Sequence, residues 1–245
     1  MQTIRERVGT LSKNILESLH LGLIVSCQAL PDEPLHGPEI MARMAVAAAE
    51  GGAIAIRANG AADVRAIKQA VALPVIGIVK RNYPDSDVYI TPTLREIEEL
   101  LEAGADIIAF DGTRQTRPEN CTLEQIIDLL KASTAASMAD ISTLEEALYA
   151  ELLGVSCVST TLSGYTPYSR QQEGPNLELL EQAARRLKIP VIAEGRISQP
   201  AQVEAALDLG AYAVVVGSAI TRPQLITRQF AAAARKVRMN RNGNE

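Results

Sequence analysis

The chain has 245 residues, of which 47% are hydrophobic and 22% are charged, and its formal net charge is −5. These values are typical of a soluble globular core, and the length suits one large α/β domain. The acidic balance argues against a nucleic-acid partner. No apolar run approaches the roughly 20 residues of a membrane span, and the N-terminus lacks the apolar stretch of a signal peptide. We therefore expect a cytoplasmic protein with no nucleic-acid and no membrane partner.

The composition also narrows the possible chemistry. The chain has no Trp, two Phe and six Tyr, so its core is expected to be packed from Ala, Val, Ile and Leu, as in parallel barrels. Cys27, Cys121 and Cys157 lie far apart without metal-binding spacing, which indicates reduced thiols. Only His20 and His36 are available for a histidine-based zinc or iron site. We expect no metal and no cofactor.

Short apolar segments alternate with amphipathic ones from residue 22 onward. Eight segments are expected to be strands, because each is a nearly continuous Val/Ile/Ala run of the kind found in buried parallel strands. These segments are Gly22–Gln28, Ala53–Ala58, Pro74–Lys80, Ala105–Asp111, Ala135–Ile141, Ser156–Leu162, Pro190–Glu194 and Ala213–Gly217. Helical spacing occurs between them, as in Leu94–Ala103 and Leu144–Leu153. Eight strand–helix units without a composition break predict one closed (β/α)8 barrel, a TIM barrel.

A weak internal repeat supports this register. A glycine that can adopt the left-handed conformation ends the helical segment before every second strand, at Gly52, Gly104, Gly154 and Gly210. We expect a single domain over residues 1–245, with a helix at 1–20 closing the bottom of the barrel and a frayed tail at 239–245. The basic residues of 235–241 are interpreted as a solvated helix end.

Polar or charged residues follow nearly every predicted strand. In parallel barrels the C-terminal ends of the strands carry the chemistry. One such residue could be a salt bridge at the barrel mouth, but the convergence of so many favours an active site. In chain order they are Gln28, Arg57, Lys80, Asp111, Asp140, Thr161 with Ser163, Glu194 with Arg196, and Gly217 with Ser218.

Lys80 is the sharpest catalytic candidate, because its stem would leave an apolar barrel wall and place the amine in the mouth. Burial and the neighbouring Arg57 would both lower its pKa, and a neutral amine can act as a base or form an imine. Glu194, nearly opposite around the ring, would favour the ammonium form. The structural alternative is that Lys80 pairs with Asp111 or Glu194 as a strut.

Arg57 suits an anion or a developing enolate, because it offers several fixed donors and keeps its charge. Its structural alternative is an ion pair with Asp111 or Glu39. Asp140 and Asp111 could take substrate hydroxyls. Asp140 could instead cap the helix over 142–153, and Asp111 could belong to a turn.

Two apolar segments that end in glycine predict a phosphate site. Glycines let the backbone approach an anion, and the N–H groups of a helix start point at it. The natural set is Gly195, Arg196, Gly217, Ser218 and Arg222. The alternative is two ordinary turns, with Arg222 on a solvated helix start.

Six sequence blocks occur together and in order: GLIVSCQ at 22–28, GIVKR at 77–81, ADIIAFDGT at 105–113, TTLSGY at 160–165, VIAEGR at 191–196 and VGSAITR at 216–222. This combination resembles the bacterial N-acetylmannosamine-6-phosphate 2-epimerases. The resemblance implies a (β/α)8 barrel that interconverts N-acetylmannosamine 6-phosphate and N-acetylglucosamine 6-phosphate in sialic-acid breakdown, without a metal or redox cofactor.

The resemblance also implies roles for single residues. It implies a catalytic lysine at Lys80 with an accompanying glutamate at Glu194. The implied substrate contacts are Gln28, Arg57 and Asp140, and the implied phosphate-side arginine is Arg222. Residues 114–118 and those after Tyr165 differ in detail from the family's pattern. These segments are expected to be loops.

The resulting hypothesis is proton transfer at carbon 2 of an open-chain sugar phosphate. Neutral Lys80 would take the proton as a single base, Arg57 would stabilise the enolate oxygen, and Glu194 would adjust the lysine. Thr161 and Ser163 are assigned to substrate binding. Two alternatives stay open, an aldolase-like barrel with an imine at Lys80 and a sugar-phosphate sensor without catalysis. The expected partner is a small sugar phosphate, and a homodimer is possible.

Overall fold

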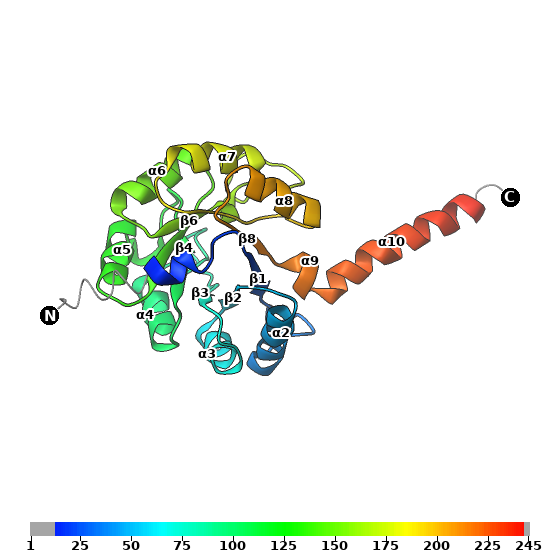
Figure 1. The fold of residues 1–245 in the computed structure, drawn as a ribbon, viewed down its shortest axis with the longest axis horizontal. Coiled ribbons are helices and arrows are strands. Elements are labelled where there is room, and N and C mark those ends of the chain that lie inside the picture. Colours follow the sequence, from blue (N-terminus) through cyan, green and yellow to red (C-terminus); the bar gives the residue numbers. More distant parts are fainter. Residues whose placement is uncertain (1–12, 243–245) are drawn as a thin grey trace.

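Eight parallel strands close into one barrel in sequential order, as Figure 1 shows for the computed structural model, which describes residues 13–242. The strands are β1 (Leu23–Cys27), β2 (Ala55–Asn59), β3 (Val75–Ile78), β4 (Ile107–Asp111), β5 (Ala136–Asp140), β6 (Cys157–Ser159), β7 (Val191–Ala193) and β8 (Ala213–Val216). Each predicted strand is present, and β8 pairs with β1 to close the ring. The predicted (β/α)8 barrel is confirmed.

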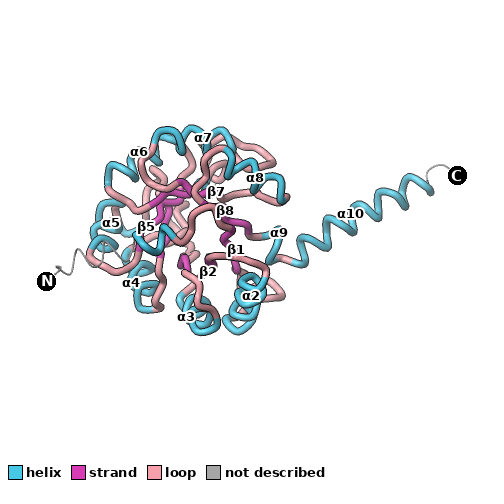
Figure 2. The backbone as a smooth tube through the Cα atoms, viewed as in Figure 1, coloured by secondary structure: helices cyan, strands magenta, loops and turns pink. Residues whose placement is uncertain are grey.

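Helices alternate with the strands and surround them (Figure 2). They are α2 (Pro38–Glu50), α3 (Ala61–Ala70), α4 (Leu94–Glu102), α5 (Leu123–Lys131), α6 (Leu144–Leu153), α7 (Leu177–Arg186), α8 (Pro200–Asp208), α9 (Ser218–Thr221) and α10 (Pro223–Asn242). Two short 3-10 helices, η1 (Pro118–Asn120) and η2 (Thr160–Leu162), lie in the loops. Among residues 13–242, no helix combines the length and apolar character that crossing a bilayer requires.

The core has two layers, because successive strand side chains point alternately into the barrel and out toward the helices. The inner layer contains residues such as Ile24, Ile76 and Ile192, whereas Ile56 and Val214 pack under the helices. Its members are small or branched, as the scarcity of aromatic residues predicts. The inner layer stops short of the C-terminal strand ends, where polar side chains take over.

The helix ends have local causes in the sequence. Helix α6 begins with a capping box in which Thr143 and Glu146 satisfy each other's backbone N–H groups. The four repeat glycines have φ values of 94°, 81°, 86° and 96°, so each occupies the left-handed region that a side chain would strain. Their predicted role is confirmed.

At the two ends of the chain the structure agrees only in part with the predicted helix at 1–20 and the predicted frayed tail at 239–245. Residues 13–17 are helical, and Leu16 and Leu19 join the inner core cluster, so this part of the expected bottom helix is present. Residues 1–12 lie outside the described residues. Helix α10 continues to Asn242, where a frayed tail from 239 was expected; its many Ala and Arg residues favour a helix. Residues 243–245 lie outside the described part of the chain.

Candidate active site

The polar residues at the mouth of the barrel continue the inward-facing positions of the strands. Arg57 lies two residues after inward-facing Ala55, and Lys80 two after Ile78. The same spacing leads from Met138 to Asp140. Two-residue periodicity therefore sends these side chains to the barrel axis instead of the helix layer. Together with the loops they surround a cavity of about 800 Å³, large enough for a phosphorylated sugar.

Arg57 connects two carboxylates at the floor of this cavity. Its Nη1 and Nη2 atoms donate to Asp140 at 3.1 and 2.5 Å, and Nη1 also donates to Glu194 at 2.8 Å. The arginine side chain is only 1% exposed. Burial alone would lower the pKa of Arg57, but the two carboxylates outweigh it and raise it above its ordinary value. The alternative partners expected for Arg57, Asp111 and Glu39, do not pair with it.

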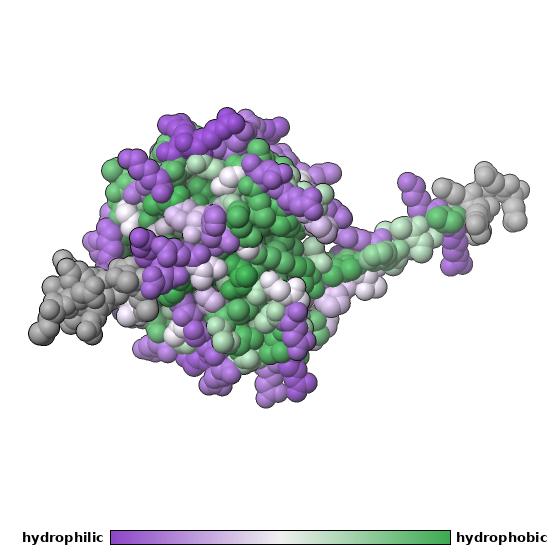
Figure 3. Space-filling view, viewed as in Figure 1, coloured by the Kyte–Doolittle hydropathy of each residue, from purple (hydrophilic) through white to green (hydrophobic). Residues whose placement is uncertain are grey.

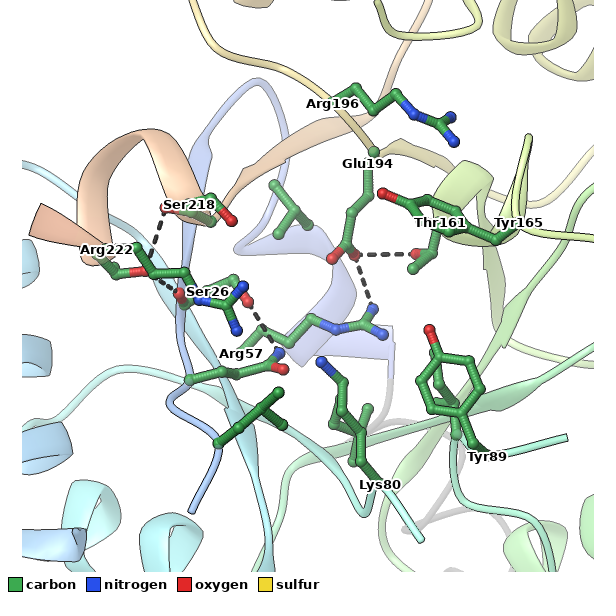
Figure 4. A pocket seen from close by; sticks show the side chains of 18 of the residues that line it. Ser26, Arg57, Lys80, Tyr89, Thr161, Tyr165, Glu194, Arg196, Ser218 and Arg222 are labelled. Atoms are coloured by element: carbon green, nitrogen blue, oxygen red, sulfur yellow. Dashed lines mark hydrogen bonds and ion pairs between the residues drawn. The ribbon is translucent and has the colours of Figure 1, made fainter. Parts of the chain in front are cut away.

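Glu194 follows β7, and among the described residues only one of its carboxylate oxygens has hydrogen-bond partners, which leaves the other for a ligand. Its Oε2 accepts from Arg57 and, at 3.0 Å, from the hydroxyl of Thr161, as Figure 4 shows. Its backbone N–H donates to Thr160, which fixes the strand end. Burial and the nearby Asp140 raise the pKa of Glu194, against the opposing effect of Arg57. Burial therefore opposes the charged form of Glu194, and the ion pair with Arg57 favours it.

Lys80 reaches the same cavity from the opposite side of the ring, since β3 and β7 are four strands apart. Within residues 13–242 its ammonium group forms no ion pair and no hydrogen bond, so the strut with Asp111 or Glu194 that was considered as the structural alternative is absent. Burial lowers the pKa of Lys80 to about 8, with further lowering by Arg57 and Arg222. The expected direction of this shift is confirmed.

The backbone at Lys80 leaves the sheet before the predicted strand end. Lys80 pairs in antiparallel fashion with Ile90, and Arg81 donates its N–H to the carbonyl of Tyr89 at 2.9 Å. The Lys80 N–H is held by the side chain of Asn59 at 2.8 Å. Strand β3 therefore ends at Ile78, because the following residues pair with their own loop. This pairing fixes the lysine stem and brings Tyr89 into the cavity wall.

The turns after β7 and β8 present backbone N–H groups to the cavity. Gly195 has φ 108° and Arg196 has φ 56°, both in the left-handed region. Among the described residues, the N–H groups of Gly195, Arg196 and Ser218 form no hydrogen bond within the protein. Successive N–H groups in such a turn bind anions. Gly217 packs against Ser26, where a Cβ atom would come within 3.3 Å.

The two arginines of the expected phosphate site have different surroundings. Arg196 donates to the carbonyls of Ser163 and Gly164, both at 2.8 Å, and its guanidinium lies 4.3 Å from the centre of the Tyr165 ring. It therefore holds the β6–α7 connection with its outer nitrogens. Arg222 pairs with Glu33 at 3.0 Å and lines the cavity beside Ser218.

Three expected residues do not reach the cavity wall. Asp140 is fully buried behind Arg57, and the helix cap considered for it is provided by Thr143 instead. The Ser163 hydroxyl accepts a hydrogen bond from Asn176 at 2.8 Å, away from the cavity. Asp111 accepts from the N–H of Thr113, which is the turn that was considered for it. The geometry of these three residues indicates that they support the side chains and turns of the site and do not contact a ligand.

The remaining expected residues do line the cavity. They are Gln28, Arg57, Lys80, Thr161, Glu194, Gly195, Arg196, Gly217, Ser218 and Arg222. Gln28 donates to the Ser26 hydroxyl at 2.8 Å, which leaves its amide oxygen for a ligand.

Sequence reasoning missed several residues of the site. Tyr89 and Glu33 come from loops whose course the strand pattern does not reveal, although both are prominent in the structure. Ser26 lies within a predicted strand, two residues after Ile24. Because side chains alternate along a strand, this spacing would have placed Ser26 on the inner side of the barrel with Ile24. Within residues 13–242, no group of three or more His, Cys, Asp or Glu side chains is placed to hold a metal ion.

Comparisons with known proteins agree with this geometry. The family model described as "Putative N-acetylmannosamine-6-phosphate epimerase" matches residues 41–236. A relative from Clostridium perfringens (strain 13 / Type A), named "Putative N-acetylmannosamine-6-phosphate 2-epimerase", is 56% identical over 216 residues, covering 88% of this chain and 98% of the relative. One of the same name from Clostridioides difficile (strain 630) is 54% identical over 219 residues, covering 89% of this chain and 98% of the relative.

A solved structure of the same family agrees with these sequence matches, and a more distant one shares the barrel. The N-acetylmannosamine-6-phosphate 2-epimerase from Clostridium perfringens superposes with a TM-score of 0.88 at 54% identity, covering 89% of this chain and 96% of that chain. Thiamine phosphate pyrophosphorylase from Pyrococcus furiosus, with a TM-score of 0.57 at 22% identity, covers 84% of this chain and 89% of that chain, and shares the fold alone.

Proposed function

The chain belongs to the N-acetylmannosamine-6-phosphate epimerase family, and we propose that it interconverts N-acetylmannosamine 6-phosphate and N-acetylglucosamine 6-phosphate. The observation that carries the proposal is the position of Lys80. Its unpaired amine, with a pKa lowered to about 8, shares one cavity with the free N–H groups after β7 and β8. The proposed base, Lys80, and the proposed anion site after β7 and β8 thus lie on different sides of the same cavity.

The phosphate group would bind on the β7–β8 side. The N–H groups of Gly195, Arg196 and Ser218 and the guanidinium of Arg222 would take its oxygens, which is a known use of these loops in parallel barrels. Binding there, remote from carbon 2, would position the sugar for the chemical step. Arg196 would contribute mainly through its backbone, because its outer nitrogens are engaged by the β6–α7 connection.

Epimerisation at carbon 2 requires removal of a proton next to a carbonyl group, and hence an open-chain aldehyde. The neutral amine of Lys80 would take this proton and become an ammonium group. The electron pair of the broken C–H bond would move to the carbonyl oxygen to give an enolate. The Lys80 ammonium group would then return a proton to the other face of carbon 2, which converts the enolate back to the aldehyde, restores the neutral amine and completes the inversion. Gln28 and Thr161 line the cavity and would orient substrate hydroxyls.

Arg57 has a less direct role than the sequence suggested. Both of its outer nitrogens donate to Asp140 and Glu194, and its Nε is buried without a partner in the described part of the chain, so few of its N–H groups could reach an enolate oxygen. Instead its positive charge helps to lower the pKa of Lys80 and holds Glu194 in place. Asp140 and Ser163 would support the site from behind. Glu194 would adjust the charge of Lys80 and offer its free oxygen to the substrate.

The direct test is incubation with N-acetylmannosamine 6-phosphate, with the anomeric protons of both sugars followed by NMR. Conversion to N-acetylglucosamine 6-phosphate supports the proposal, and its absence from well-folded protein contradicts it. The matched substrate without phosphate is expected to react far more slowly, because it lacks the anion that the β7–β8 turns bind.

A lysine with this pKa also suits imine chemistry, as in class I aldolases, so the two mechanisms need a separate test. Borohydride reduces an imine to a stable amine and would attach the substrate covalently to Lys80. We expect no mass increase after treatment with substrate and borohydride. A protein that only senses sugar phosphates would bind the substrate without converting it.

A further inference from the structure

The β3–α4 loop returns to the barrel at residues 89–91 and lies between the ends of β3 and β4. These two strands pair directly at only two positions, so a gap opens between them toward the cavity. On the β3 side, the Thr91 N–H donates to the carbonyl of Val79 at 2.7 Å. On the β4 side, the Asp111 N–H donates to the carbonyl of Ile90 at 3.0 Å. The backbone at 89–91 is therefore fixed to both strands.

Thr91 has a backbone conformation that is unusual for a β-branched residue. Its φ is 46°, in the left-handed region. Its hydroxyl donates to the carbonyl of Ala109 at 2.7 Å and accepts from the N–H of Val79 at 3.2 Å. Strain of this kind persists only where the surrounding contacts enforce it, and it is typical of functional sites. The side chain that this arrangement fixes at the cavity is Tyr89, which lies beside Lys80.

The hydroxyl of Tyr89 points into the cavity (Figure 4). Within residues 13–242 this hydroxyl forms no hydrogen bond. Burial raises the pKa of Tyr89 above its ordinary value, and three neighbours that would repel a phenolate add to this effect, Asp140, Tyr165 and Asp111. Arg57 acts in the opposite direction but is outweighed. The phenol therefore keeps its proton and can donate it in a hydrogen bond to a ligand.

Tyr89 lies on the side of the cavity where carbon 1 of the proposed substrate would be. Figure 4 shows Arg222 and Ser218 on one side of the Lys80 amine and Tyr89 on the other. In an extended sugar 6-phosphate, carbon 1 lies beyond carbon 2 when counted from the phosphate. With the phosphate beside Arg222 and carbon 2 at Lys80, the carbonyl oxygen on carbon 1 comes to the Tyr89 side.

The other side chains on this side of the cavity have their hydrogens engaged or lie toward solvent. Both outer nitrogens of Arg57 donate to carboxylates. The single hydroxyl hydrogen of Thr161 is shared between carboxylate oxygens at 2.9 and 3.0 Å. Tyr165 is 57% exposed, and Asn82 is also exposed. Tyr89 is thus the best-placed uncommitted donor for an oxygen on carbon 1.

The surroundings of Tyr89 are poor in water. Val88 and Ile90, which flank it in the chain, are buried, and its side chain packs against the inner core cluster. At the opposite end of the barrel Leu16 and Leu19 join that cluster, and the space-filling view of this end shows side chains across its middle (Figure 3). A fixed donor is most effective on developing charge where water is excluded.

We propose that Tyr89 is a catalytic residue whose hydroxyl donates a hydrogen bond to the oxygen on carbon 1 while the enolate forms. The inference rests on the proposed epimerisation and adds to it a donor that Arg57 does not supply. As the electron pair of the C–H bond moves to this oxygen, its negative charge grows and the hydrogen bond strengthens. Tyr89 keeps its proton throughout, so Lys80 is the group that takes the proton from carbon 2 and returns it.

Tyr89→Phe tests the donor, because it removes the hydroxyl and keeps the ring. Loss of one donor to a developing oxyanion lowers kcat by about 10²- to 10³-fold. We expect a loss of about 10²-fold in kcat for N-acetylmannosamine 6-phosphate, with KM and the melting temperature little changed, because the hydrogen bond strengthens in the transition state. An unchanged kcat, or a raised KM with an unchanged kcat, would overturn the proposal.

Tyr83→Phe is the matched control on the same loop. The hydroxyl of Tyr83 donates to Glu96 at 2.9 Å, away from the cavity, so this variant should keep the kcat of the wild type. Equal losses in the two variants would show that the loop as a whole is sensitive and would overturn the assignment to Tyr89. A larger loss in Tyr165→Phe than in Tyr89→Phe would overturn it in favour of Tyr165.

The pH profile separates action on the substrate from action through Lys80. In Tyr89→Phe the acidic limb of kcat/KM should keep its midpoint near pH 8, because the hydroxyl does not set the pKa of Lys80. A displaced midpoint would show that Tyr89 acts through the lysine. Replacement of Tyr89 by 3-fluorotyrosine, a more acidic phenol, should move the alkaline fall of kcat/KM to lower pH, because a phenolate donates no hydrogen bond. An alkaline limb that stays in place would overturn the proposal even if Tyr89→Phe does not fold.

The same assays distinguish this inference from the proposed function. If well-folded wild type does not convert N-acetylmannosamine 6-phosphate, the proposed function is wrong and the role of Tyr89 falls with it. If the wild type converts the substrate and Tyr89→Phe converts it equally fast, the proposed function stands and the role of Tyr89 alone is refuted.

Discussion

At the scale of single residues, the site depends on one lysine that is held without a partner. A buried ammonium group is normally paired, because removing it from water is unfavourable. Lys80 instead faces an open cavity with Arg57 close enough to lower its pKa further. A group kept in a costly environment without a structural partner is typical of a functional site.

Replacement of Lys80 by methionine should therefore abolish turnover and stabilise the fold. Loss of a general base reduces rates by about 10²- to 10⁴-fold. Because the pKa of Lys80 falls from 10.5 to about 8 on folding, the folded state binds its proton more weakly, and methionine should raise the free energy of unfolding at pH 7 by about 3 kcal/mol. Urea titration and the NMR assay measure both effects.

Lys68→Met is the matched control. Lys68 pairs with Asp106 at the surface, at 2.7 Å, far from the cavity. Its replacement should leave turnover unchanged and slightly lower the stability. An active and destabilised Lys80→Met would contradict the assignment of the base.

The pH dependence follows from the same pKa. The reactive form of Lys80 is the neutral amine, whose fraction rises with pH until the folded-state pKa of about 8 is passed. We expect kcat/KM to increase tenfold per pH unit on the acidic side and to level off above about pH 8. A profile that is flat between pH 6 and 9, measured with initial rates, would exclude a lysine base of this pKa.

At the scale of elements, the β6–α7 connection is tied to the site by one arginine. Gly164 in this connection has φ 77°, and a Cβ atom there would come within 2.6 Å of Arg196 Nη1. Gly164→Ala should therefore displace the arginine and loosen the turn that presents the Gly195 and Arg196 N–H groups. We expect a several-fold rise in KM and a lower melting temperature, because a side chain at this φ is also strained.

Gly174→Ala provides the control within the same connection. A Cβ atom at Gly174 would meet only the Gln202 amide at 3.9 Å, and Gly174 has no left-handed φ. This variant should match the wild type in KM. Equal effects of the two substitutions would show that the connection as a whole, not Arg196, is sensitive.

The strand and helix pattern was predictable from the sequence because it depends on local periodicity. All eight strands were expected, and Leu144–Leu153 was predicted with its observed bounds. The strand ends were less accurate where tertiary contacts intervene. Lys80 was placed at the end of a strand, but the chain leaves the sheet after Ile78 to pair with Ile90, a contact that no local pattern indicates.

The candidate site could be predicted as a set of residues but not as a network. The C-terminal ends of the predicted strands were expected to carry the site, and this placed Lys80 and Glu194 on the cavity. Which side chains would pair could not be predicted: Asp111 and Glu39 were the partners considered for Arg57, and the structure pairs it with Asp140 and Glu194. Loop residues such as Glu33 and Tyr89 lack any periodic signal.

At the scale of the whole molecule, the barrel and the last helix behave as two parts joined at the active site. Arg222 lines the cavity, and Pro223 begins α10. The sequence indicated a solvated basic helix end, because the direction of α10 away from the barrel cannot be read from local spacing.

The most direct test of the central claim is the fate of the hydrogen on carbon 2 during turnover in deuterated water. In D₂O the amine of Lys80 becomes an ammonium group with one substrate hydrogen among its three, so most returns to carbon 2 deliver deuterium. The account predicts deuterium at carbon 2 of both epimers with the wild type, and neither exchange nor conversion with Lys80→Met. Conversion that leaves carbon 2 free of deuterium after many turnovers, or exchange that persists in Lys80→Met, would contradict it.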